Sequence, residues 1–241
     1  MPTSTVAPAA GTRQARFVRV THWLTALAFF ALLVSGIEVL LSHPRFYWGE
    51  TGNVNMAPLF SIPVPASRRT VPTGYGYVLP DQNGWSRYLH VQSAWLLIVT
   101  GLVYAWAGIR TGHFRTNLVP PRADRSWPAL GASLAAHVRF TTAAFGDGGS
   151  YNVLQRISYL SVVFALVPLI IWTGLAMAPA FTAVVPWAAT VLGGRQSART
   201  LHFLITIALV LFTAVHVAMI ILAGFRSRIR AMITGNAEAP L

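Results

Sequence analysis

The segment RTLHFLITIALVLFTAVHVAMIILAG, residues 199–224, is long and apolar and carries two histidines, His202 and His216. An α-helix turns about 100° per residue, so fourteen residues bring the second imidazole to within about 40° of the first. At about 1.5 Å per residue, the two rings lie about 21 Å apart along one face. That separation places one ring near each side of a hydrocarbon core about 30 Å thick. Because ionisable groups inside a membrane are costly and usually functional, the two imidazoles indicate two stacked metal centres.

Composition indicates an integral membrane protein. Of the 241 residues, 54% are hydrophobic and only 10% are charged, whereas a soluble domain carries about 25% charged residues. Cysteine is absent, which excludes disulfides, iron–sulfur clusters and thiolate metal sites. The formal charge of +12 is accompanied by no basic run, so we expect no nucleic-acid partner and attribute the arginine excess to membrane topology.

Four apolar stretches are long enough to span a membrane as helices, at residues 18–41, 88–109, 153–178 and 199–224. We therefore predict an all-α, integral membrane four-helix bundle over residues 13–232, with long loops after the first two helices. Residues 1–12 are predicted to be a disordered tail and residues 233–241 a C-terminal tail. The stretch 179–198 is apolar but broken by Pro179 and Pro186, so we expect it to lie at the interface. With twelve arginines on the N-terminal side against six on the other, both termini are predicted to be inside.

The direction of each helix pairs the histidines by depth. His90 begins the second helix and His202 begins the fourth, so both are expected near the outer side. His22 begins the first helix and His216 lies further along the fourth, so both are expected near the inner side. Two imidazoles from facing helices at one depth suit the iron of a six-coordinate haem, which supplies four further nitrogens itself. No carboxylate completes a zinc site, and no CxxCH motif exists, so two non-covalent b haems are predicted. The alternative is that these histidines only form hydrogen bonds between helices.

Residues near the ligands are candidate haem contacts. Gly36, Gly101 and Gly174 could let a flat macrocycle approach the backbone, although ordinary helix packing accounts for them equally well. Four arginines stand close to the ligands in the sequence and could pair with haem propionates, or only set the topology by snorkelling: Arg16, Arg19, Arg87 and Arg199.

The start of the third helix is a candidate quinone site. Asn152, Gln155 and Arg156 would supply polar groups near the inner side, although Asn152 could serve only as a helix cap and Arg156 could only snorkel. The remaining histidines, His43, His113 and His137, fall in predicted loops and are expected to be solvated.

These residues resemble the four-helix di-haem cytochrome b membrane subunits. That family includes bacterial cytochrome b561, the b-type cytochrome of nickel–iron hydrogenases, and the gamma subunits of formate dehydrogenase and thiosulfate reductase. The motif RVTHW at Arg19–Trp23 resembles the family's opening motif, His90 matches its second-helix ligand, and His202 and His216 match its fourth-helix ligands. The resemblance implies transmembrane electron transfer between a redox partner and the quinone pool, in the inner (cytoplasmic) membrane of a bacterium. We expect electrons to enter at the outer haem and to reduce quinone near the inner face.

The outer loop at 42–87 is longer than in the minimal cytochrome b561 pattern and is rich in aromatic residues. Such a composition suits a protein interface, so we expect an extracytoplasmic redox subunit to dock there. A molybdopterin oxidoreductase is the preferred partner by family analogy, which would make the chain the electron-transfer subunit of a respiratory oxidoreductase. The assembled complex could contain a homodimer of the chain. The alternatives are a stand-alone cytochrome b561-like quinone oxidoreductase and a haem-free membrane scaffold.

Overall fold

The computed structural model describes residues 14–53, 55–63, 82–121, 125–138 and 153–235. The chain divides into two compact units. The first comprises Met1–His22, Tyr104–Leu160 and Thr213–Leu241, and the second comprises Trp23–Val103 and Ser161–Phe212. Each predicted histidine pair falls within one unit: His22 and His216 in the first, His90 and His202 in the second.

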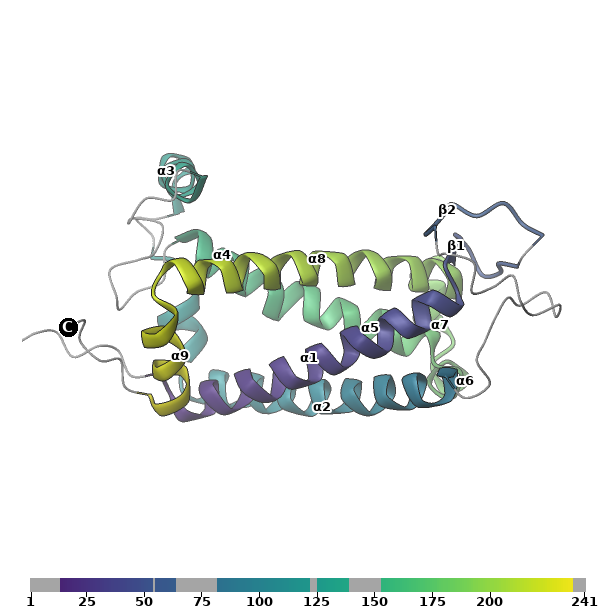
Figure 1. The fold of residues 1–241 in the computed structure, drawn as a ribbon, viewed down its shortest axis with the longest axis horizontal. Coiled ribbons are helices and arrows are strands. Elements are labelled where there is room, and N and C mark those ends of the chain that lie inside the picture. Colours follow the sequence, from purple (N-terminus) through teal and green to yellow (C-terminus); the bar gives the residue numbers. More distant parts are fainter. Residues whose placement is uncertain (1–13, 54, 64–81, 122–124, 139–152, 236–241) are drawn as a thin grey trace, which may run out of the picture. The chain divides into compact units, whose positions relative to one another are not determined.

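Within the described residues, four helical spans are long and apolar enough to cross a membrane, which confirms the predicted all-α membrane fold. They are α1 (Arg16–Ser42), α2 (Gln82–Arg110), a composite of α4 (Val153–Ser161), η4 (Val162–Leu166) and α5 (Val167–Met177), and α8 (Arg195–Leu222) (Figure 1). Both α2 and α8 begin earlier than predicted. Their first turns are polar, so the apolar pattern alone does not detect them.

The composite helix contains a π-helical turn, η4, which ends at Leu166, two residues before Pro168. Proline has no N–H group to donate, and its ring clashes with a carbonyl of the preceding turn. A π-helical turn is wider than an α-helical one, so it can absorb this local mismatch without ending the helix.

The helices carry apolar side chains outward and small hydroxyl side chains inward. On α1, Leu27, Phe30 and Val34 are largely exposed, as expected of side chains that face lipid. The buried polar residues among those described are all serines or threonines: Thr21, Ser35, Ser86, Ser93, Thr100, Ser133, Thr173, Ser197 and Thr200. Small hydroxyl residues allow close helix contact. Four of these hydroxyls donate to a carbonyl in the preceding turn: those of Thr21, Ser35, Thr173 and Ser197.

A short hairpin in the second unit covers the beginning of α8. Its strands, β1 (Arg45–Phe46) and β2 (Phe60–Ser61), pair in the antiparallel sense (Figure 1). Phe46 stacks on Phe60 with ring centroids 4.6 Å apart and contacts Phe203 of α8 at 4.5 Å. The loop is also tied to α8 by polar bonds, from Gly49 N to Ser197 Oγ and from Thr200 Oγ1 to the Tyr47 carbonyl, both 2.7 Å long. The first part of the long outer loop is therefore folded and fixed to the fourth helix.

The stretch between the last two spans forms two short helices, α6 (Pro179–Val184) and α7 (Trp187–Thr190). Pro179 is the first residue of α6, and Pro186 separates the two helices. The prediction that prolines interrupt this apolar stretch agrees with the structure, since neither helix is long enough to span a membrane.

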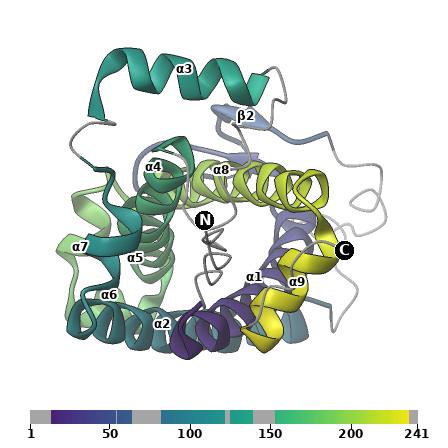
Figure 2. The same ribbon diagram turned by 90° about the vertical axis from the view of Figure 1, so that its left-hand side faces the viewer.

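Helices in the first unit extend into segments that were predicted as a loop and a tail. The predicted loop at 110–152 contains η1 (Phe114–Leu118) and α3 (Trp127–Val138), and α9 (Phe225–Thr234) runs into the predicted tail at 233–241. Gly224 precedes α9 with φ of 98°, a left-handed conformation that lets the chain turn after α8. Arg19 Nη1 donates to the Ile233 carbonyl at 2.7 Å and so joins the beginning of α1 to the end of α9. Figure 2 shows these two helix ends side by side.

Candidate metal centres

The outer histidine pair meets in the second unit. His90 lies on α2 and His202 on α8, and their ring centroids are 6.2 Å apart with an interplanar angle of 56°. The structure therefore brings together the two residues that were paired from helix direction and depth.

The inner pair meets in the first unit with nearly the same geometry. His22 of α1 and His216 of α8 have ring centroids 6.4 Å apart and an interplanar angle of 53°. Tyr159, on α4, also makes a T-shaped contact with His216, with the ring centroids 6.1 Å apart.

Both separations fit one metal ion held between two imidazoles. A metal–imidazole bond is about 2.0 Å long and the ring centre lies about 1.1 Å from each nitrogen, so two opposed imidazoles have centres about 6.2 Å apart. The interplanar angles are compatible with this arrangement because each ring can rotate about its metal–nitrogen bond. Among the described residues no three His, Cys, Asp or Glu side chains gather at one place. Each pair thus suits a metal that brings its other ligands with it, as haem iron does.

Two buried hydroxyl groups orient the outer imidazoles. The distance from Ser35 Oγ on α1 to His90 Nδ1 is 3.0 Å, and that from Thr173 Oγ1 on α5 to His202 Nδ1 is 2.9 Å. These contacts occupy Nδ1 of each ring and leave Nε2 for a metal. Ser35 and Thr173 were not predicted from the sequence, although each directly precedes a glycine that was.

Those glycines lie against the outer ligands. A Cβ atom at Gly36 would lie 3.4 Å from His90 Cε1, and one at Gly174 would lie 3.4 Å from His202 Cε1. The absence of a side chain there admits the imidazole of the neighbouring helix. A Cβ atom at Gly101 would meet nothing within 4 Å. A haem contact at Gly101 stays a prediction.

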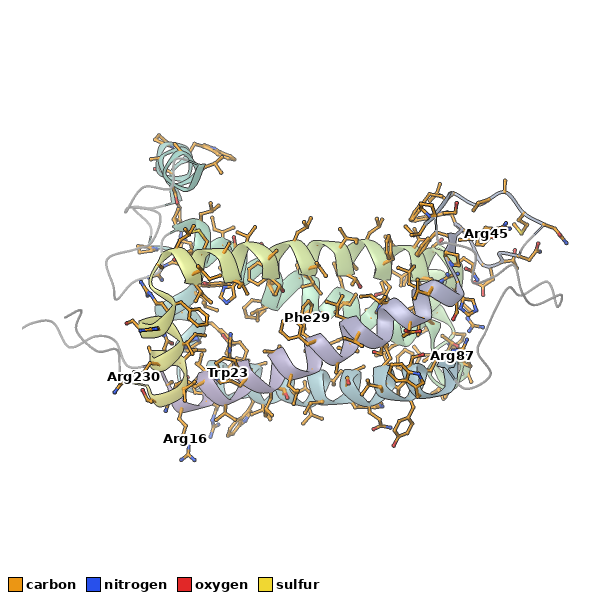
Figure 3. The ribbon with its side chains drawn as sticks, viewed as in Figure 1. Arg16, Trp23, Phe29, Arg45, Arg87 and Arg230 are labelled. Carbon is orange, nitrogen blue, oxygen red and sulfur yellow. The ribbon has the colours of Figure 1, made fainter. Side chains whose placement is uncertain are left out.

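The four candidate arginines have different surroundings. Arg199 donates to the carbonyl of His43 and lies over the Phe46 ring at 5.1 Å, so it helps to hold the outer hairpin. Arg19 is held by α9, as described above. Arg16 and Arg87 are exposed, and Figure 3 shows Arg16 extending away from the helices. Propionate binding by these arginines stays a prediction.

Of the candidate quinone residues, Arg156 has a defined structural role. Its Nη1 donates to the carbonyls of Asn117 and Val119, at 2.8 and 3.3 Å, and so fixes the segment around η1 to α4. Gln155 lies beside it on α4 and is half-buried, whereas Asn152 lies outside the described residues.

The remaining histidines are not all in solvated loops. His43 is exposed, as predicted. His113 is instead half-buried and packs among aromatic rings, with centroids 5.5 Å from Phe17 and 6.0 Å from Tyr104, so it is less solvated than predicted. Burial lowers the pKa of His113 below its usual 6.5. His137 lies on α3 and not in a loop.

Comparison with known proteins agrees with this geometry. The family model of prokaryotic cytochrome b561 matches residues 13–235. A putative protein-methionine-sulfoxide reductase subunit YedZ1 from Azospira oryzae is 31% identical over 225 residues, which cover 91% of this chain and 94% of that protein. No solved structure matches the chain. The chain therefore belongs to the prokaryotic cytochrome b561 family, and it is a multi-pass bacterial membrane protein of haem-based electron transfer.

Proposed function

We propose that the chain holds two b-type haems, one between His90 and His202 and one between His22 and His216. When bound, the haems would carry electrons one at a time between an extracytoplasmic redox subunit and the quinone pool of the bacterial inner membrane. The matching ring separations of the two pairs, 6.2 and 6.4 Å, are the observation that carries this proposal.

The protein's own contribution is to fix the ligands and to close the iron to other chemistry. Two imidazoles per iron leave no position for oxygen or a substrate, so the sites are suited to electron transfer and not to catalysis at the metal. The apolar exteriors of the helices keep both pairs in a surrounding of low dielectric constant.

The related subunit from Azospira oryzae suggests the class of the partner. Its name assigns it to a protein-methionine-sulfoxide reductase, so we propose that this chain serves a catalytic subunit of that kind, with a molybdopterin cofactor by family analogy. A sulfoxide reductase consumes electrons. Electrons would then pass from quinol to the outer pair, the reverse of the direction expected from the sequence.

The outer hairpin is the proposed docking surface for that subunit. Trp48 and Leu59 on it are 57% and 61% exposed, and exposed tryptophan often anchors a protein interface. Replacement of Trp48 by alanine should weaken co-purification of the catalytic subunit and leave the haem spectrum unchanged. Trp127→Ala on α3 is the matched control. If both variants bind the catalytic subunit equally well, the hairpin is not part of the interface.

The first experiment is to count haems. Purified wild-type protein should give two low-spin b haems per chain in a pyridine haemochrome assay, His90→Ala and His216→Ala should each lose one, and His113→Ala should lose none. One haem per chain in the wild type would refute one of the pairs. If folded protein that has been supplied with haem binds none, the alternative of a haem-free membrane scaffold would be favoured.

The quinone part of the proposal has its own test. We place the quinone near Gln155 and Arg156 on the inner side, so Gln155→Leu and Arg156→Lys should slow quinol turnover while retaining both haems. The lysine ammonium group in Arg156→Lys can still donate to the carbonyls of Asn117 and Val119, so this variant guards against unfolding of that segment. Quinol turnover at the wild-type rate in both variants would place the quinone site elsewhere.

A further inference from the structure

Two pairs of neighbouring residues, Ser35–Gly36 on α1 and Thr173–Gly174 on α5, contact the outer ligands in the same way. In each pair the hydroxyl lies at hydrogen-bonding distance from Nδ1 of a histidine, and the glycine lies against Cε1 of the same ring. The ligands themselves are on α2 and α8. Each outer imidazole is therefore held by a helix that supplies no ligand.

The hydroxyl hydrogens are already committed to the backbone. Ser35 Oγ donates to the Ala31 carbonyl at 2.7 Å, and Thr173 Oγ1 donates to the Leu169 carbonyl at 2.9 Å. A hydroxyl group has one hydrogen, so its remaining capacity is to accept. With its hydrogen on the backbone carbonyl, each hydroxyl can only accept from the imidazole, which assigns the ring proton to Nδ1. With Nδ1 protonated, the lone pair of a neutral imidazole is on Nε2, the nitrogen left for iron.

We propose that Ser35 and Thr173 are positioning residues that fix the tautomer of the outer ligands and strengthen them as donors to iron. The inference rests on the proposed haem between His90 and His202. An acceptor at Nδ1–H raises the basicity of a ligating imidazole, and a more basic ligand favours the ferric over the ferrous state. Both hydroxyls therefore hold the midpoint potential of the outer haem below the value it would have without them.

Thr173 offers the sharpest test because valine has the same shape and lacks the hydroxyl. Thr173→Val should retain two haems per chain and raise one of the two midpoint potentials in a redox titration. A threefold to tenfold loss of ferric preference corresponds to about 30 to 60 mV for one electron. Thr173→Ser retains the acceptor and should restore the wild-type potential, and Ser35→Ala should raise the same potential as Thr173→Val.

Thr206→Val is the matched control on α8. The hydroxyl of Thr206 donates to the backbone carbonyl of His202 at 2.8 Å and not to its ring. Its removal is therefore expected to leave both midpoint potentials unchanged. Unchanged potentials in the Ser35→Ala and Thr173→Val double variant would overturn the inference, as would equal shifts in Thr173→Val and Thr173→Ser. Thr173→Val could lose a haem altogether. In that case, two haems in Thr173→Ser would support the role of the hydroxyl, and loss of a haem from Thr173→Ser as well would refute it. Wild-type protein with fewer than two haems would instead refute the proposed function.

Discussion

Gly174 is expected to set a size limit at the outer ligand pair. A Cβ atom at this position would lie 3.4 Å from His202 Cε1 and 3.8 Å from its Nδ1. Carbon atoms in favourable contact are about 3.5–4.0 Å apart, so alanine fits against the ring with little adjustment. Valine adds two γ carbons about 1.5 Å beyond Cβ, and its stiff χ1 in a helix gives them little freedom to turn away.

The cost of valine follows from that geometry. Overpacking of a close contact costs about 1–3 kcal/mol, which corresponds to roughly a 5- to 150-fold loss of affinity for haem at this site. The ring cannot simply move aside, because Thr173 holds its Nδ1 from the same helix. We expect Gly174→Ala to retain two haems per chain and Gly174→Val to lose the outer one during purification.

The assay is haem content per chain, followed by titration of the purified protein with haem to recover the lost site. Gly131→Val on α3 is the control for valine in a helix, since a Cβ atom there meets nothing within 4 Å. Two haems with wild-type affinity in Gly174→Val would show that the imidazole is not confined by α5. The reasoning from the glycine contact would then be wrong.

Two other predictions concern stability. Thr200→Val leaves the Tyr47 carbonyl without its 2.7 Å bond in a buried place. It should therefore lower the free energy of unfolding by about 1–3 kcal/mol and speed proteolysis of the outer hairpin. Thr190→Val, at an exposed position, is the control and should have neither effect. His113 has a pKa below its usual value because of burial, so the unfolded chain binds more protons and stability should fall as pH drops below about 6.5. Thermal unfolding in detergent at about pH 7.5 and pH 5 should show a smaller difference for His113→Gln than for the wild type, and an unchanged difference would refute the assignment.

The spans and the histidine pairs could be predicted because both depend on long-range regularities of the sequence. A span is defined by length and hydropathy, and the depth of a histidine follows from its place on that span. The short elements were missed for the opposite reason. WPALGASLAAHV of α3 contains Pro128 and Gly131, which favour a break, and α9 carries three arginines, so neither segment has the pattern of a span. The hairpin depends on contacts with Ser197 and Thr200, more than a hundred residues away.

Ser35 and Thr173 could not have been selected from the sequence alone. Serine and threonine inside a helix commonly bond to the carbonyl one turn before them, and both residues do so here. Whether the same oxygen also meets an imidazole depends on how a neighbouring helix is rotated about its axis, and hydropathy contains no information on that rotation. The glycine that follows each hydroxyl was the available signal, since it marks where the neighbouring ring comes close.

The outer site uses four helices although only two of them provide ligands. Its two ligand–support pairs, Ser35 with His90 and Thr173 with His202, have no side chain in common. Changes at independent contacts add in free energy, whereas changes that share a partner do not. The two imidazoles would share one iron, so the rise in midpoint potential in the Ser35→Ala and Thr173→Val double variant should exceed either single rise, and its departure from their sum measures the coupling between the two ligands. A combined rise no larger than that of one single variant would mean that one substitution already displaces both rings, and the two imidazoles would then have to be treated as one mechanically coupled unit.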